Sequence, residues 1–481
     1  MKKIVIVRHG ESEGNANNII QGRNNDYGLT EKGKKVTYLN LHSNIDAIRG
    51  ARRIISSTSN RTMETAEIIS NELGIQIFEN SNIKEIDAGI LSGMDKDEAN
   101  TIYPNYYQIW KKRQDLDEIP NAEKGEDLQA RVLSFLMQYY DKVEYCDIIV
   151  SHAGFIRCLI NTIENRDRTF QFNIENSAFF SINDIFRNMS IQRRERAMNS
   201  KVLIITTPNG KYVAKLKKGK IVEKDYAEQS LLNNLEGDNI PKVLCLQNYD
   251  NGEYCKIIKY VKGKHIYGKL NDDEYKALIK SEKELESVLD KYKNKKIFEI
   301  NNLRKKVETI YKNAKNSYIK ELAKELLMSK QWSTIEDTEN YVLSHNDLNR
   351  DNILFERTED GSIKANIIDF ESLELAPKDF QFASMIASGL LLEGENIQKL
   401  KETIKQKNMD LERILFLMQI RVLEGLYFFQ ENSNEYVLSR KDVTRELLKK
   451  YFFSNEIIQK EMENLKKAKG DNKDNEKILY K

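Results

Sequence analysis

Two stretches of the chain share one pattern, in which a run of β-branched residues is followed, one residue later, by a histidine and then, within two residues, by a glycine. The first runs from Ile4 to Gly10 and the second from Ile148 to Gly154. Such runs predict short buried strands, each ending in a tight turn. Ligands of open α/β sheets bind beyond the carboxyl ends of the strands. The pattern therefore predicts a site that contains His9 and His152.

Two arginines are expected at the same site. Arg8 directly precedes His9, and Arg61 falls in the first turn of a helix that follows a second predicted strand, 53–57. Free backbone N–H groups at a helix N-terminus favour anions. A guanidinium stays charged and matches phosphate oxygens in a fork. These residues indicate a phosphate site.

Four motifs follow one another within the first 154 residues. They are Val-Arg-His-Gly-Glu-Ser-x-x-Asn from Val7, Ser-x-Arg-Thr-x-x-Thr-Ala-Glu from Ser59, Glu85 ahead of Gly89, and Val-Ser-His-Ala-Gly from Val150. In this order they resemble the histidine phosphatase (phosphoglycerate mutase-like) family. The resemblance implies an α/β domain, a three-layer sandwich whose mostly parallel sheet has helices on both faces.

The resemblance also implies a role for each residue. His9 is the nucleophile that becomes phosphohistidine, and Glu85, with Asp87 as the alternative, is the proton donor. The phosphate would be bound by Arg8, Arg61, His152 and Asn15. The chemistry fits, because a neutral imidazole is nucleophilic near neutral pH and the leaving alkoxide needs a proton. No metal is required. The compact length resembles the phosphatase branch of the family, and a phosphomutase is the alternative.

The second half of the chain has a different order of predicted strands and helices. A β-hairpin is predicted over 202–216, a helix over 222–235, strands over 241–246 and 254–261, and long helices over 272–289 and 302–328. Then come His345, Asp347 and Asn352 in the spacing His-x-Asp-x-x-x-x-Asn, and a strand that ends in Asp369. This set resembles the aminoglycoside phosphotransferase/choline kinase branch of the protein-kinase-like fold, which implies an α+β bilobal domain.

The kinase resemblance implies a second set of roles, with ATP and Mg²⁺ as cofactors. Asp347 would deprotonate an acceptor hydroxyl, and Asn352 and Asp369 would hold Mg²⁺. Lys215 would pair with the ATP phosphates and be held by Glu228. Several departures are evident: Asn346 and Asn349 replace the Gly and His of the aminoglycoside side, no GxGxxG precedes Lys215, and no Ala-Pro-Glu follows Asp369. Asp379 lies only ten positions after Asp369 and leaves no room for an activation loop, so we expect a small-molecule acceptor.

Composition excludes several other classes. A net charge of +2 gives no field that would mark a nucleic-acid-binding protein. The basic segment 185–200, with Arg187, Arg193, Arg194 and Arg196, is expected to be a final hairpin and linker. The apolar stretch 414–429 is interrupted by Gln419, Arg421 and Glu424, which predicts a core helix rather than a membrane span. Four cysteines without CxxC spacing are typical of a reduced, cytoplasmic protein.

We therefore expect a phosphatase domain over 1–197, a kinase-like domain over 201–465 and a charged tail over 466–481. Within the first domain, helices are predicted over 99–113, 126–140 and 155–163. The expected protein is a bifunctional enzyme that acts on a small-molecule phosphate ester and a small-molecule alcohol. The alternative for the second domain is a catalytically silent module that senses a nucleotide or a metabolite.

Overall fold

The computed structural model describes residues 2–23, 27–113, 115–194, 200–235, 240–292, 295–388, 391 and 396–431. It divides into two compact units. The first spans Met1–Val222 and Lys242–Tyr260, and the second spans Glu223–Pro241 and Val261–Lys481. The predicted tail and Arg196 lie outside the described residues.

The first unit is built on a five-stranded sheet in the order β3-β2-β4-β1-β5. The strands are β1 (Lys2–Arg8), β2 (Arg53–Ser56), β3 (Ile77–Glu79), β4 (Tyr145–Ser151) and β5 (Phe179–Asn183). The first four run parallel, and β5 is antiparallel to β1. The central strands β1 and β4 are therefore the two that end in His9 and His152.

Helices cover both faces of this sheet. They are α2 (Glu31–Ser43), α3 (Ile45–Ile48), α4 (Asn60–Leu73), α7 (Gly125–Met137) and α8 (Ala153–Ile163). Alternate residues of β1 serve the two cores: Ile4 and Ile6 pack with α7 and α8, whereas Val5 and Val7 pack with α2, α3 and α4. A strand buried on both faces reads as the continuous apolar run seen in the sequence. The predicted three-layer α/β fold is confirmed.

One predicted helix of this unit is wrong. The segment 99–113 forms two helices, α5 (Lys96–Ile102) and α6 (Pro104–Lys111), rather than one. Tyr103 between them has φ −128° and ψ 59°, outside the helical region. Proline disfavours the helical conformation in the residue before it, so Pro104 ends one helix and begins the next.

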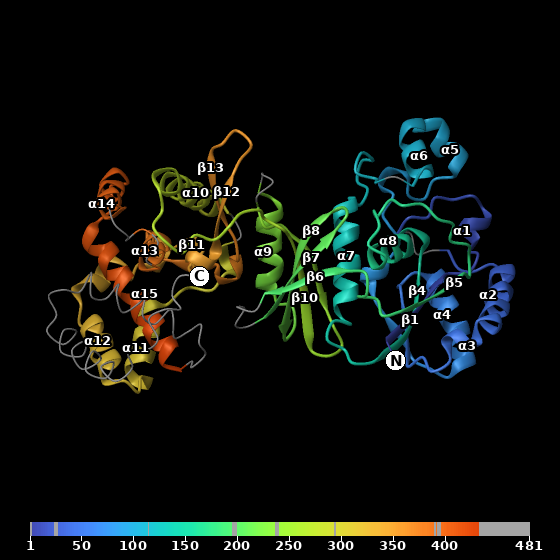
Figure 1. Cartoon of the computed structure of the whole chain (residues 1–481), viewed down its shortest axis with the longest axis horizontal. Helices are drawn as coiled ribbons and strands as arrows, with labels where there is room; N and C mark the ends of the chain where they lie inside the picture. The colour runs from blue at the N-terminus through green and yellow to red at the C-terminus, as the bar shows by residue number, and fades with distance from the viewer. Residues whose placement is uncertain are drawn as a thin grey trace. The chain divides into compact units, whose positions relative to one another are not determined.

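A second sheet packs against α7 within the same unit (Figure 1). Its strands, all antiparallel, are β6 (Ser190–Arg194), β7 (Lys201–Thr207), β8 (Gly210–Lys218), β9 (Val243–Asn248) and β10 (Glu253–Lys259), in the order β6-β7-β8-β10-β9. The predicted β7–β8 hairpin is confirmed. Arg193 and Arg194 lie on the edge strand β6, which pairs with β7 and so belongs to this sheet. Residues of the second sheet and of α7 share one hydrophobic core.

The second unit is mostly helical. Its helices are α9 (Glu223–Asn233), α10 (Asp272–Lys291), α11 (Leu303–Asn313), α12 (Ser317–Leu327), α13 (Phe380–Ala387), α14 (Asn396–Gln406) and α15 (Leu411–Glu431). The single helix predicted over 302–328 is wrong, because Ala314 to Asn316 separate α11 from α12. The Asn316 side chain accepts a hydrogen bond from the Ile319 N–H, which is typical of a helix start.

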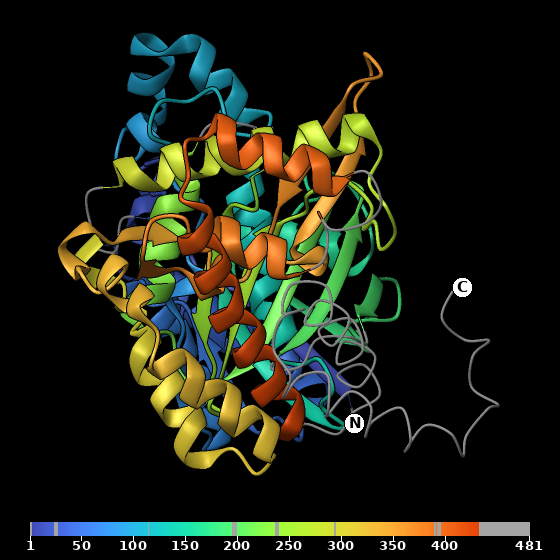
Figure 2. The same ribbon diagram turned by 90° about the vertical axis from the view of Figure 1, so that its left-hand side faces the viewer.

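Two short antiparallel pairs lie among these helices. One joins β11 (Val342–Ser344) to β14 (Glu374–Ala376), and the other joins β12 (Ile353–Arg357) to β13 (Ile363–Ile367). Helix α15 lies beside α11 and α12 (Figure 2). Among the described helices, none combines the length and the apolar character needed to cross a membrane.

Candidate active sites

His9 and His152 lie side by side because they follow adjacent strands. Their ring centroids are 5.2 Å apart in an edge-to-face arrangement, and both side chains are buried. Arg8 and Arg61 act electrostatically on both rings. The structure thus brings together four of the five residues that the sequence assigned to phosphate binding and attack, and Asn15 is described below.

The backbone after β1 fixes the orientation of His9. Its Nδ1 lies 2.7 Å from the Gly10 carbonyl oxygen, which can only accept a hydrogen bond. Nδ1 therefore carries the hydrogen, and Nε2 keeps a free lone pair. The Gly10 N–H donates to Thr65 Oγ1 at 3.0 Å, and a Cβ at Gly10 would lie 2.5 Å from Thr37 Oγ1. Gly10 is thus the residue that lets the turn pack closely.

The charges around His9 keep it neutral. Burial, followed by the positive charges of Arg8 and Arg61, holds the pKa of His9 well below its usual range. Burial and the charge of Arg61 do the same to the pKa of His152. Burial lowers the pKa of Arg61 to about 10, so this guanidinium is still charged at pH 7. The site therefore holds positive charge on the arginines and a nucleophilic imidazole.

Asn15 is held by a residue that sequence reasoning missed. The Oδ1 atom of Asn15 accepts hydrogen bonds from Ser12 Oγ at 3.0 Å and from Asn176 Nδ2 at 3.1 Å. The NH₂ group of Asn15 is therefore left to donate to a phosphate. Asn176 also donates to the Gly10 carbonyl oxygen at 3.0 Å. Asn176 lies in the loop before β5, and no motif in the sequence marks it.

Glu85 is fixed at the N-terminus of α8. Its carboxylate accepts hydrogen bonds from the N–H groups of Ile86 at 2.9 Å, Gly154 at 3.2 Å and Phe155 at 3.2 Å. A Cβ at Gly154 would lie 2.5 Å from Glu85 Oε1, so a larger residue there would displace the carboxylate. The alternative donor, Asp87, instead accepts from the N–H of Gly89 in its own turn at 3.0 Å.

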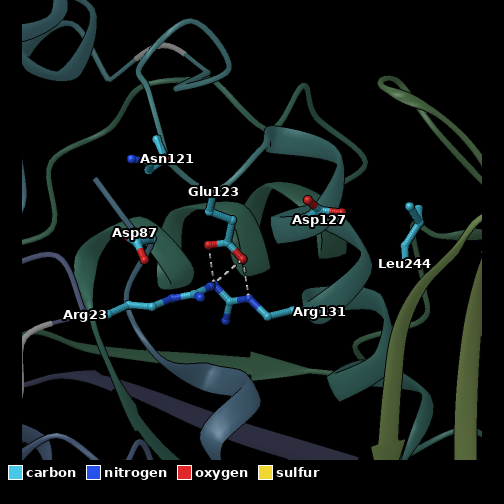
Figure 3. A pocket seen from close by; sticks show the side chains of 8 residues that line it. Arg23, Asp87, Asn121, Glu123, Asp127, Arg131 and Leu244 are labelled. Atoms are coloured by element: carbon cyan, nitrogen blue, oxygen red, sulfur yellow. Dashed lines mark hydrogen bonds and ion pairs between the residues drawn. The ribbon is translucent and has the colours of Figure 1, made fainter. Parts of the chain in front are cut away.

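A second group of charged residues, also missed from the sequence, consists of Arg23, Glu123 and Arg131, whose side chains meet (Figure 3). This group holds the loop that carries Glu85. Glu123 accepts two hydrogen bonds from Arg131, at 2.7 and 2.8 Å, and forms an ion pair with Arg23 at 2.7 Å. Arg131 donates to the Asn82 carbonyl oxygen at 2.5 Å, and Arg23 donates to that of Glu85 at 3.2 Å. Arg23, Glu123 and Arg131 line a cavity of about 300 Å³.

The kinase-like residues of the second unit are joined through the backbone. His345 Nε2 lies 3.0 Å from the Ile368 carbonyl oxygen, and the Ile368 N–H donates to the Asn352 carbonyl oxygen at 2.9 Å. Asp369 follows Ile368 in the left-handed region, with φ 66°. His345 therefore ties the loop after β11 to the end of β13, which brings Asp369 to the loop that carries Asp347 and Asn352.

Each oxygen of the Asp347 carboxylate is held by a neighbour. Oδ1 accepts from Asn349 Nδ2 at 2.8 Å and from Arg421 at 2.8 Å, and Oδ2 accepts from Asn352 Nδ2 at 3.1 Å. Because the Asn352 NH₂ group faces Asp347, its amide oxygen is the atom left for a cation. With Asp369 this gives two oxygen donors, the ligand type that Mg²⁺ prefers.

Arg421 on α15 is a further residue that sequence reasoning did not assign to the site. It interrupts the apolar run of α15, which was the only signal available. Besides Asp347 it pairs with Glu424 at 3.2 Å. Burial opposes its charge, but Glu424 and Asp347 outweigh burial and raise the pKa of Arg421.

Lys215 and Glu228 are both buried, Lys215 on β8 of the first unit and Glu228 on α9 of the second. Their pairing stays a prediction.

Two family models match the chain, one after the other. The model of the histidine phosphatase superfamily (branch 1) matches residues 4–185, and that of the phosphotransferase enzyme family matches residues 191–394. Each covers the residues assigned above to one of the two sites, apart from Arg421.

Curated relatives match the first part of the chain. The probable phosphoglycerate mutase GpmB of Escherichia coli O1:K1 is 31% identical over 164 residues, which are 34% of this chain and 75% of that protein. The protein of the same name from Salmonella arizonae is 32% identical over 165 residues, with the same two shares.

Solved structures also match. A mycobacterial glucosyl-3-phosphoglycerate phosphatase has a TM-score of 0.33 at 19% identity, over 37% of this chain and 89% of that one. The α-ribazole phosphatase of Shigella flexneri has a TM-score of 0.34 at 21% identity, over 38% of this chain and 92% of that one.

Proposed function

The chain belongs to the histidine phosphatase superfamily through residues 4–185 and carries a phosphotransferase domain over residues 191–394, and from this we propose a bifunctional enzyme. The first domain hydrolyses phosphomonoesters through a phosphohistidine at His9. The second transfers phosphate from ATP to the hydroxyl of a small molecule, with Asp347 as the base. We place the boundary between the domains at residues 197–201.

The observation that carries the first activity is the state of His9, which is neutral, fixed in one tautomer and set between buried cations. Its Nε2 attacks phosphorus while Arg8, Arg61 and the Asn15 amide neutralise the oxygens of the phosphate. Glu85 gives a proton to the leaving oxygen and then takes one from the water that cleaves the phosphohistidine. No step requires a metal ion.

The observation that carries the second activity is the Asp347 carboxylate, oriented by Asn349, Asn352 and Arg421. Asp347 accepts the proton of the acceptor hydroxyl as that oxygen attacks the terminal phosphate of ATP. The oxygens of Asn352 and Asp369 would hold Mg²⁺, which neutralises charge on the phosphates when bound. Lys215 supports the phosphates of ATP.

Hydrolysis of p-nitrophenyl phosphate tests the first activity. We expect release of p-nitrophenol in the presence of EDTA, and a loss of at least about 10³-fold in His9→Ala. ATP consumption by the second domain should be unchanged in this variant. Hydrolysis retained by His9→Ala would exclude the phosphohistidine mechanism.

ATP turnover tests the second activity. Wild type and Asp347→Ala are compared with Mg²⁺ and a panel of alcohols, amino alcohols, sugars and nucleosides. We expect at least one acceptor to be consumed by the wild type at about 10²-fold the rate of the variant or more. Consumption that never exceeds that of Asp347→Ala would favour the alternative, a silent sensing module.

A phosphomutase is the second candidate for the first domain, because the curated relatives bear the name of phosphoglycerate mutase. Incubation with a phosphoglycerate separates the two reactions: a phosphatase releases inorganic phosphate, whereas a mutase moves phosphate between hydroxyls. We expect inorganic phosphate. The use of ATP, together with four buried cysteines outside disulfides, supports a cytoplasmic location.

A further inference from the structure

Arg157 is a buried cation that the mechanism above does not use. It lies on α8, one turn after Gly154, and the whole residue is 7% exposed to solvent. Its Nε atom is buried without a hydrogen-bond partner. Within the described part of the chain, no hydrogen bond or ion pair reaches its guanidinium. Proteins almost always pair a buried charge, because removing it from water is costly.

Two neighbouring arginines show what a structural role looks like in this domain. Arg131 on α7 is equally buried, but it forms a double hydrogen bond with Glu123 and also donates to carbonyl oxygens. Arg168 is paired in the same way with Asp115. Arg157 has no such carboxylate, so its partner is missing from the described chain.

The surroundings of Arg157 place it at the phosphatase site. Its charge interacts with those of Arg8, Arg113 and Glu85. Burial lowers the pKa of Arg157 to about 10, so it remains a cation at pH 7. Residues three apart on a helix share a face, and Gly154, three residues earlier, is where the Glu85 carboxylate docks. Arg157 therefore lies on the side of the site from which Glu85 protonates the leaving oxygen.

We propose that Arg157 binds a second anionic group, a carboxylate or a phosphate, on the alcohol part of the substrate, with Arg113 adding positive charge nearby. The inference rests on the proposed hydrolysis at His9, because it concerns the alcohol that this reaction releases. A guanidinium binds either anion through two parallel hydrogen bonds. The substrate class is then a phosphomonoester of an alcohol that carries another anion.

Three esters with the same carbon chain test the proposal. Glycerol 3-phosphate has no second anion, glycerate 3-phosphate has a carboxylate, and glycerol 1,3-bisphosphate has a second phosphate. We expect kcat/KM for one or both of the last two to exceed that for glycerol 3-phosphate by about 10-fold to 100-fold. Whichever ester has the higher kcat/KM shows whether Arg157 binds a carboxylate or a phosphate.

Substitutions then connect the preference to Arg157. The ratio to be measured is kcat/KM for an ester with a second anionic group divided by kcat/KM for glycerol 3-phosphate. Arg157→Gln should bring this ratio to within about threefold of one, and Arg157→Lys should restore part of it. Arg49→Gln is the matched control, because Arg49 is an exposed arginine of the same domain that forms an ion pair with the exposed Asp46. It should leave the ratio at the wild-type value.

The wild-type measurement decides the matter even if Arg157→Gln fails to fold. Hydrolysis of p-nitrophenyl phosphate with no preference among the three esters, or with none of them hydrolysed, would overturn the inference and leave the role of His9 intact. A ratio kept by folded Arg157→Gln would also overturn it. Failure to hydrolyse p-nitrophenyl phosphate at all would instead overturn the proposed function.

Discussion

The two phosphoryl centres differ in the charge that they hold before a ligand arrives. Around His9 the structure gathers the guanidiniums of Arg8 and Arg61, with two imidazoles kept neutral by burial. Around His345 lie the carboxylates of Asp347 and Asp369, and Arg421 pairs with Asp347 and with Glu424. One centre is already complementary to a phosphate dianion, whereas the other would repel one.

The contrast shows how each centre can neutralise the negative charge of a phosphate group. Guanidiniums fixed by the fold neutralise a phosphate directly, so the first centre can work with protein groups alone. Asp369 and Asn352 offer oxygen atoms, which bind a cation rather than a phosphate. In the proposed reaction, the second centre would therefore rely on a bound cation to make its charge complementary to ATP.

Removal of divalent metal should produce the largest difference between the activities of the two centres. Dialysis against EDTA should abolish ATP consumption, because the carboxylates alone repel the phosphates, and Mg²⁺ should restore it. Hydrolysis of p-nitrophenyl phosphate by the same sample should change by less than about twofold. A parallel loss of both activities would break the comparison.

Substitution of Arg421 tests whether the base needs its cation. Arg421→Ala removes the 2.8 Å contact with Asp347, so the carboxylate loses one of its orienting partners. We expect the rate of phosphate transfer to fall by about 10-fold to 100-fold, with partial recovery in Arg421→Lys. The assay is ATP consumption with the acceptor found in the panel.

The exposed Lys280 on α10 provides the control for this experiment. Lys280→Ala should transfer phosphate at the wild-type rate. Unchanged transfer by Arg421→Ala would show that Asn349 and Asn352 orient the base without it.

Gly154→Ala should reduce activity without reducing stability. On helix propensity alone, alanine would stabilise α8 by up to about 1 kcal/mol. The added Cβ, however, would lie 2.5 Å from Glu85 Oε1 and displace the proton donor. We expect kcat for p-nitrophenyl phosphate to fall by about 10-fold while the melting temperature is kept.

Gly50→Ala is the converse control. Gly50 has φ 85° with no atom within 4 Å of a new Cβ, so alanine there is strained but touches nothing. It should lower the melting temperature and keep the activity. Full activity in Gly154→Ala would mean that Glu85 does not need its place on α8.

The smallest expected effect is on pH dependence. An exposed histidine gains its proton as the pH falls through about 6.5. The pKa of His9 lies well below that value because of burial and the arginines, so His9 stays neutral and nucleophilic in weak acid. We expect the acid limb of the kcat/KM profile for p-nitrophenyl phosphate, which reports the free enzyme, to lie well below pH 6.5. A limb at about 6.5 or above would contradict the neutral, desolvated imidazole.

Local patterns predicted those parts of the sites that a single stretch of chain builds. The strand, histidine and glycine of 4–10 and 148–154 were recognisable because a tight turn after a buried strand has its own residue signature. The break at Pro104 also had a local signal, and the apolar spacing of 99–113 obscured it. The local signal between α11 and α12 is weaker, because Asn316 marks the start of α12 without a proline or a glycine beside it.

Residues that meet through tertiary contacts could not be predicted in the same way. Asn176 reaches Asn15 across 161 positions, and Arg421 reaches Asp347 across 74. Glu123 joins Arg23 to Arg131 only because α7 packs beside the loop of Glu85. Such pairings depend on how helices pack, and no spacing in the sequence encodes that packing.

Helix α7 has a consequence for attempts to divide the chain. Its residues Leu128–Met137 are all buried, because it is covered on one side by the first domain and on the other by the sheet β6–β10. The Tyr249 hydroxyl of that sheet donates to the Ser134 carbonyl oxygen of α7. A fragment cut at residue 197 would leave an apolar flank of α7 in water, where it would promote aggregation. The two activities are best separated by point substitution in the intact chain. The segments matched by the two family models share one hydrophobic core, so the chain cannot be divided between them without exposing it.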